Sequence, residues 1–225
     1  MKNDAQSNSN QPAVFEISYL RVKEGSEKAF RLGWTHVSRE MEKAAGIRYM
    51  GLFESFYSFP QKKARNAFVQ ISQWDSMEAM VQAQSHHKLK DSGEFANTYV
   101  VEEQYQMKAA GDLPVHFREM IGSEYAIEFA ARTIKPSKRS VYPKLRNDFM
   151  KFIKDQPGYA FDQEFEALAQ DVDVLIFGWK TVEDFQNAGK RVKRSIKQLF
   201  KTVRYFQLIK HRGFQVGTCV EFVAR

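Results

Sequence analysis

The chain has 225 residues, 43 % hydrophobic and 14 % aromatic, enough for one large core or two units of roughly 100 residues each. No stretch approaches the roughly 18 consecutive apolar residues of a membrane-spanning helix, and the polar start lacks the apolar centre of a secretory signal. The single cysteine, Cys219, cannot form an internal disulfide, and no Cys or His spacing indicates zinc. We therefore expect a cytoplasmic protein with no membrane contact and no metal, whose residues 1–12 form a disordered tail.

The net charge of +7 is concentrated in one segment. Residues 190–212 contain nine Lys or Arg and no Asp or Glu, which leaves 25 basic against 27 acidic residues in the rest of the chain. Such a segment can bind nucleic acid or another anionic partner. Apolar residues recur through it at helical spacing: Val192, Ile196, Leu199, Phe200 and Val203. This pattern favours an amphipathic helix with a solvated basic face over a nucleic-acid site.

The first half of the chain predicts six elements. Alternating apolar residues, helical periodicity and the turn residues between them give strand 14–20, helix 26–45, strands 47–54 and 68–74, helix 76–90 and strand 99–107. Ser26 is a suitable N-cap for the first helix, and Gly46 supplies the positive φ that often ends one.

The second half predicts the same six elements in the same order. They are strand 125–131, helix 138–155, strands 159–165 and 172–179, helix 182–201 and strand 203–210. Each half therefore has the order β-α-β-β-α-β, which is typical of a four-stranded antiparallel sheet with both helices on one face, the ferredoxin-like arrangement.

Recurring residues indicate that the two halves are copies of one unit. Trp74 and Trp179 each end an apolar run and are followed by a hydroxyl residue two positions on and Glu four positions on. Gly46 lies 112 positions before Gly158, and Glu16 lies 112 before Glu128. The two tryptophans are 105 apart, so the first copy carries about seven extra residues, which fall in the polar loop 58–66.

We therefore predict an α+β fold of tandem ferredoxin-like repeats packed sheet to sheet. Each sheet alone would leave an apolar face in water, and two sheets in one chain can cover each other. The predicted boundaries are repeat 1 at 13–107, a linker at 108–123, repeat 2 at 124–212 and a C-terminal extension at 213–225 that could add a strand.

The chain also resembles a known family. A Lys23-x-Gly25 turn with Phe30 behind it, Gly46 after the helix, a strand ending in Trp74, and Glu78-Ala79 followed by Ser85-His86-His87 are similar to the antibiotic-biosynthesis-monooxygenase-like (ABM) family of dimeric α+β barrels. The resemblance covers 15–107 and, more loosely, 125–210. It implies an intramolecular dimeric α+β barrel, in which one chain makes the barrel that two chains usually share. The protein would be a monomeric pseudo-dimer or a homodimer.

The resemblance implies where a site would lie. Family members include cofactor-independent monooxygenases acting on polyphenol or quinol-like substrates, haem-degrading enzymes, and proteins of no known activity. In the first group substrate lies between sheet and helices, with an Asn four residues before the strand-end Trp. Here Gln70 takes that position before Trp74, and alternation places Ser72 on the same face. Both tryptophans can equally be core residues.

Three further side chains are candidates. His86 and His87 end the second predicted helix, where one could act as general base or haem ligand, although a histidine there can also be a simple helix cap. Glu16, matched by Glu128 in repeat 2, could face the interior as a base or ligand, or lie on a solvated edge.

The resemblance therefore implies a small-substrate oxidoreductase that needs no cofactor. An aromatic substrate would supply electrons to oxygen, with Gln70, His86 and His87 as catalytic candidates and Trp74, Ser72 and Glu16 as substrate-binding candidates. The alternatives are a non-enzymatic binding protein on the same barrel and a haem-binding or haem-degrading protein. Because repeat 2 has Leu175, Phe177 and Trp179 on the matching face, we expect side chains to fill its equivalent space.

Overall fold

The computed structural model describes residues 13–58, 64–90, 93–110, 116–121 and 124–224, and the expected tail at 1–12 lies outside them. The first unit contains strands β1 (Val14–Val22), β2 (Ile47–Ser58), β3 (Ala67–Trp74) and β4 (Tyr99–Ala109), helices α1 (Glu27–Glu42) and α2 (Met77–Lys90), and a short 3₁₀ helix, η1 (Ala96–Thr98). A four-residue helix, α3 (Phe117–Met120), separates it from the second unit.

The second unit repeats the order with one change. It contains strands β5 (Ala126–Ile134), β6 (Tyr159–Ala167), β7 (Asp173–Trp179) and β8 (Ile209–Ala224), helices α4 (Tyr142–Lys154), α5 (Val182–Arg194) and α6 (Ile196–Phe206), and the 3₁₀ helix η2 (Pro136–Lys138). None of the described helices has the length and apolar character that a bilayer crossing requires.

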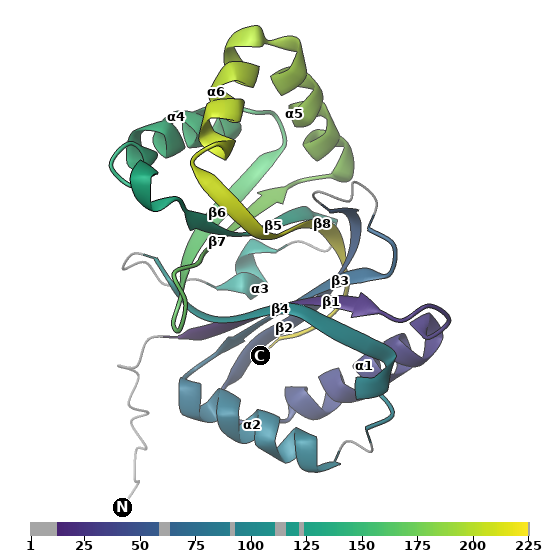
Figure 1. The fold of residues 1–225 in the computed structure, drawn as a ribbon. Helices are drawn as coiled ribbons and strands as arrows, with labels where there is room; N and C mark the ends of the chain where they lie inside the picture. Colours follow the sequence, from purple (N-terminus) through teal and green to yellow (C-terminus); the bar gives the residue numbers. More distant parts are fainter. Residues whose placement is uncertain (1–12, 59–63, 91–92, 111–115, 122–123, 225) are drawn as a thin grey trace, which may run out of the picture.

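All eight strands form one closed barrel in the order β1-β3-β2-β8-β5-β7-β6-β4. Every pairing in it is antiparallel, and two seams, β2 with β8 and β4 with β6, join the repeats. Figure 1 shows the consequence, with α1 and α2 covering one side of the barrel and α4, α5 and α6 the opposite side. The predicted tandem ferredoxin-like fold is confirmed, and the two sheets also join at their edges.

Strand alternation divides the apolar residues between three layers. The barrel interior is filled from both repeats, for example by Ile17 and Ile71 from the first and by Phe129 and Ile176 from the second, all fully buried. The opposite faces of the strands pack against the helices. Each repeat therefore has one face in the shared core and one in its own sheet-to-helix layer, where the resemblance places a substrate.

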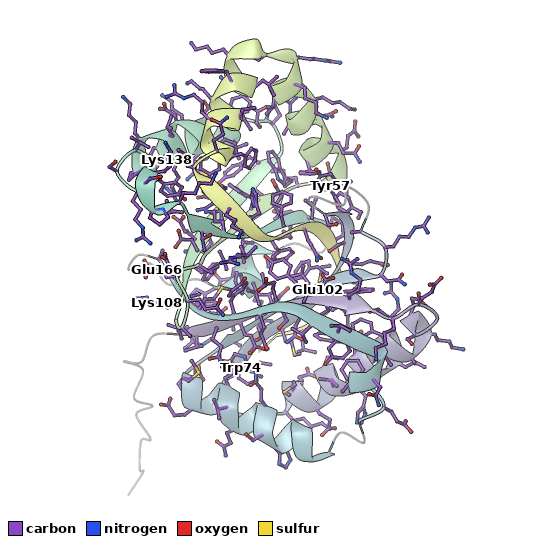
Figure 2. All side chains as sticks on the ribbon, viewed as in Figure 1. Tyr57, Trp74, Glu102, Lys108, Lys138 and Glu166 are labelled. Atoms are coloured by element: carbon purple, nitrogen blue, oxygen red, sulfur yellow. The ribbon has the colours of Figure 1, made fainter. Side chains whose placement is uncertain are left out.

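The register of the strands supports the duplication. Trp74 pairs with Val14 and Ile47, and Trp179 pairs with residues 126 and 159, which are 112 positions further on in both cases. Each tryptophan ends the third strand of its unit, directly before a helix. Figure 2 labels Trp74 between the first sheet and α2.

The end of the second repeat differs from the prediction. One helix at 182–201 and a strand at 203–210 were expected, but the helix breaks at Ser195 and a second helix continues to Phe206. The Ser195 hydroxyl accepts a hydrogen bond from the Gln198 amide at 3.4 Å, so Ser195 caps α6. The last strand, β8, begins only at Ile209, and residues 213–224, expected as an extension, are its continuation.

The predicted linker contributes to the barrel interior. Phe117 on α3 is fully buried and contacts the ring of Phe15 with centroids 5.3 Å apart. Its amide donates a 3.2 Å hydrogen bond to Oε1 of Gln73 on β3. Because β4 extends to Ala109, the connection between the repeats begins later than the predicted residue 108.

Candidate functional site

The candidate site is a cavity of about 370 Å³ in the sheet-to-helix layer of the second repeat. Its wall is built by β5, β7 and β8 on one side and by α4, α5 and α6 on the other, and Tyr57 on β2 also contributes. Figure 2 labels Tyr57 where β2 approaches the second helical layer. The expectation that side chains would fill this space around Leu175, Phe177 and Trp179 is therefore wrong, because all three line the cavity.

Small residues on both walls create the space. Ala130 lies on the cavity face of β5, while Ala188 and Gly189 lie opposite it on α5. A Cβ atom added at Gly189 would meet nothing within 4 Å. Sheet and helix therefore remain apart at this level, although large apolar side chains pack on either side.

The first repeat shows what occupies the corresponding position there. At the 105-residue offset of the tryptophans, Gly189 corresponds to Gln84, and Gln84 Nε2 donates a 2.9 Å hydrogen bond to Glu16 Oε2. The second repeat has Glu128 in place of Glu16, but it has no side chain at 189 to reach it. The exchange of Gln for Gly therefore leaves the second carboxyl group facing an open cavity.

Glu128 is the central polar group of this cavity. Its side chain is half-buried, and Trp179 Nε1 donates to its Oε1 at 2.8 Å. Burial raises the pKa of the Glu128 carboxyl to about 7, and the Trp179 hydrogen bond opposes that shift only in part. Near neutral pH this carboxyl group can both take up and release a proton.

An ionic cluster lies at another part of the wall. Arg132, only 1 % exposed, donates from Nη1 to the Tyr205 hydroxyl at 2.8 Å and pairs through Nη2 with Glu164. Glu164 also binds Arg146, and Asp173 lies directly across the ladder from Arg132. Two arginines and two carboxylates are thus grouped together, so the positive charge of Arg132 is compensated within the protein.

His211 on β8 is next to Arg132 in the ladder and also lines the cavity. Its ring lies between Phe206 and Phe214, with centroids 5.4 and 5.6 Å away. Burial, and secondarily the charge of Arg132, lowers the pKa of His211. The imidazole is therefore neutral at pH 7, and it is the cavity's one described histidine.

The mouth of the cavity lies between α5 and α6. Five lining residues are exposed, and all belong to these two helices: Gly189, Lys193, Leu199, Val203 and Phe206. In Figure 1 this helical pair forms one end of the molecule, distant from the first repeat. A ligand would enter past an apolar rim that carries one lysine.

The structure brings three of the predicted site residues together in the first repeat. Trp74 Nε1 donates to Ser72 Oγ at 2.9 Å, and Glu16 lies opposite Ser72 in the β1–β3 ladder. All three are buried, and Gln70, on the same face, is half-buried. The predicted common face is thus present, with Glu16 bonded to Gln84 as described above.

Of the two predicted histidines, the structure describes the side chain of His86. His86 is exposed on α2, unlike the buried residues Glu16, Ser72 and Trp74. His87 also lies on α2, but its side chain is outside the described part of the structure.

Sequence reasoning noted Glu128 only as the partner of Glu16 and missed four residues of the cavity: Arg132, Gly189, Lys193 and His211. One signal was present in the repeat itself. Matching the two helices at the tryptophan offset places Gly where the first repeat has Gln, and a glycine within an amphipathic helix often has a packing or functional reason.

Comparison with solved structures shows what this fold is similar to. A candidate monooxygenase from Fusobacterium nucleatum matches with a TM-score of 0.65 at 7 % identity, covering 96 % of both chains. An anthrone oxidase-like protein matches with 0.66 at 9 % identity, covering 96 % of this chain and 94 % of the other. A haem-binding protein from Thermus thermophilus matches with 0.56 at 12 % identity, covering 93 % and 92 %.

These likenesses extend over almost the whole chain, so the predicted dimeric α+β-barrel fold is confirmed. No protein-family model matches the sequence, and no curated protein matches it. At such low identities the solved structures indicate the fold alone, and the chemistry depends on the residues of the cavity.

Haem is the prosthetic group that the family resemblance suggests. An axial nitrogen for the haem iron would have to come from His211, whose ring packs between the rings of Phe206 and Phe214 and whose Nδ1 is buried. The volume of about 370 Å³ lies at the low end of the roughly 300–1,000 Å³ usual for ligand pockets, which suits two or three fused rings. A tetrapyrrole is much larger, so the cavity does not fit a haem.

Proposed function

We propose that this protein is a monooxygenase-type oxidoreductase that binds a small hydroxylated aromatic compound in the second-repeat cavity. The observation that carries the proposal is Glu128, a carboxyl group with a pKa of about 7 on the wall of a mostly apolar cavity. An aromatic ligand fits the apolar wall, and a base that titrates near neutral pH is suited to deprotonating it.

In this proposal the ionised Glu128 accepts the acidic proton of the substrate. The resulting anion is electron-rich and reduces O2 directly, so the electrons come from the substrate. For a ring methylene in the keto form, one oxygen atom becomes a new carbonyl oxygen, and the other leaves as water with the two methylene hydrogens. Trp179 fixes the carboxyl through its 2.8 Å hydrogen bond, and the apolar walls exclude water from the anion.

The similar folds add support to this proposal. Two of the matching structures are those of a candidate monooxygenase and an anthrone oxidase-like protein. The oxidation of a ring methylene to a carbonyl is a reaction that a cavity with one tuned carboxyl group can support.

The test is oxygen consumption with anthrone and with 1,4-naphthohydroquinone, corrected for their spontaneous oxidation. We expect the parent protein to consume oxygen and Glu128→Gln to lose roughly 10²- to 10⁴-fold in rate, the usual contribution of general base catalysis. The matched variant Glu16→Gln distinguishes the two repeats. If Glu16→Gln loses the activity and Glu128→Gln keeps it, the site lies in the first repeat.

Two other results would contradict the proposal. Calorimetric binding of these aromatics without any protein-dependent oxygen consumption would indicate the non-enzymatic binding protein. Stoichiometric haem binding, detected as a shifted Soret absorption band, would indicate the haem-binding alternative and show that the cavity can expand.

A further inference from the structure

The mouth of the cavity has a positive charge for which the described residues show no ion pair. Lys193 lines the cavity and is exposed at its mouth. The surrounding segment, 190–212, has nine Lys or Arg and no acid, so neither the end of α5 nor α6 offers Lys193 a carboxylate. The ammonium group of Lys193 therefore sits in a positive field beside an apolar opening.

The inner part of the cavity disfavours an anion. Among the described lining residues the one acid is Glu128, which above its pKa of about 7 would repel a second carboxylate. Arg132 is the other cationic side chain of the described wall, but it pairs with Glu164 and lies close to the charge of Asp173, and these two carboxylates balance Arg132 and Arg146. Burying a ligand carboxylate among the apolar side chains would therefore carry a large desolvation cost.

These two observations indicate how a ligand with a polar group at each end would be oriented in the cavity. We propose that the cavity takes an aromatic acid, a fused-ring compound whose carboxylate pairs with Lys193 at the mouth and whose hydroxyl points inward to Glu128. The inference rests on the proposed function in taking Glu128 as the group toward which the acidic proton of the ligand points. The volume of about 370 Å³ lies at the low end of the range for ligand pockets and suits a ring system of two or three rings.

A matched pair of ligands tests the inference by calorimetry at pH 7.5 and low salt. 6-Hydroxy-2-naphthoate has its carboxylate and hydroxyl at opposite ends, and 2-naphthol lacks only the carboxylate. We expect the acid to bind roughly three- to tenfold more tightly, which is the scale of a partly exposed ion pair. The advantage should shrink as salt is raised to about 0.5 M, because added ions screen an exposed pair.

The variant Lys193→Gln should bind both ligands equally well. Lys190→Gln is the matched control, because Lys190 is exposed on the same helix, contacts Asn187 and does not line the cavity. It should retain most of the preference for the acid. Thermal melts verify that both variants fold, and neither residue is buried, so no large loss of stability is expected.

Each outcome decides one question. Equal binding of the two ligands by the parent, or a preference that survives Lys193→Gln, overturns the inference while leaving the proposed function intact. Failure of both ligands to bind overturns both. A preference that depends on Lys193, in a protein that consumes no oxygen with any aromatic, supports the aromatic-acid site and rejects the oxidation.

Discussion

Glu128 and Glu16 occupy equivalent strand positions but have different partners. Gln84 bonds to Glu16, whereas the indole of Trp179 bonds to Glu128. The indole of Trp74 cannot do the same in the first repeat, since it donates to Ser72, a residue that is Phe177 in the second. The two repeats thus differ at two positions that matter here: Gln84 corresponds to Gly189, and Ser72 corresponds to Phe177. These differences give Glu16 a side-chain amide as partner and leave Glu128 facing the cavity.

The raised pKa of Glu128 predicts a pH-dependent stability. At low pH the Glu128 carboxyl is protonated in both the folded and the unfolded chain, so its ionisation does not affect the free energy of unfolding. As pH rises toward about 7 the unfolded chain ionises first, so stability is lost until the folded carboxyl has ionised as well. Glu128→Gln cannot ionise at this position and so lacks this loss. The free energy of unfolding of the variant minus that of the parent should therefore increase by roughly 2–3 kcal/mol between pH 5 and pH 8.

Urea denaturation at several pH values measures this difference. Glu166→Gln is the control, because Glu166 is half exposed and pairs with exposed Lys108 at 3.3 Å, a contact of little energetic value. Figure 2 labels both residues, which lie across the seam from β4 to β6. A difference between Glu128→Gln and the parent that does not change with pH would mean that Glu128 is ionised normally in the folded protein.

Sequence alone predicted which residues of the third strand share a face, but it expected the space on the matching face of the second repeat to be filled, and that space is the cavity. Alternation along residues 68–74 correctly placed Gln70, Ser72 and Trp74 on one face, because a strand has a fixed period of two. Whether a face is open or filled depends on how far side chains reach from the opposite helix. Gln84 and Gly189 decide that question, and neither belongs to the strand pattern.

At the scale of elements, α5 offers a direct test of how the cavity arises. Gly189→Ala should stabilise the protein by about 0.5–1 kcal/mol, because alanine favours a helix and its Cβ meets nothing within 4 Å. Gly189→Gln copies the first repeat, so its amide should reach Glu128 and fill the cavity. We expect this variant to fold normally and to lose most of its affinity for 2-naphthol.

Calorimetry with thermal melts distinguishes these effects. Gly189→Ala is the matched control, since it adds a side chain too short to cross the cavity. If Gly189→Gln binds 2-naphthol as tightly as the parent, the ligand does not occupy the space beside Glu128.

The α5–α6 pair shows a limit of periodicity. Residues 182–201 keep a helical apolar pattern across Ser195, so the sequence predicts one helix, although the chain turns there. Ser195 is a good N-cap in retrospect, but serine also occurs within helices and gives a weak signal alone. The turn allows α6 to contact α4 and to form one side of the cavity mouth.

At the scale of the whole molecule, duplication and face-to-face packing followed from the sequence pattern, and a barrel followed from the family resemblance, but the strand pairs that close the barrel were not predicted. The seams depend on strand ends: β2 continues to Ser58 and β8 to Ala224, where they pair over most of their length. The sequence did not indicate that β2 continues through residues 55–58, because they precede a polar loop. It predicted 213–225 as an extension that could add a strand, but as a segment separate from the last strand of the repeat.

Closure predicts that the two repeats depend on each other. A protease site placed between Ala110 and His116 should give two fragments that remain associated on gel filtration, because β2–β8 and β4–β6 hold them along both edges.

Each half expressed alone would expose an apolar sheet face of several hundred Å² by the usual scale of such patches, including Ile71 in the first and Ile176 in the second. We therefore expect the separate halves to aggregate or to dimerise through that face. Light scattering during gel filtration measures the masses, and a mixture of the two halves should restore the parent mass. Stable, soluble monomers of either half would show that its sheet does not need the other repeat.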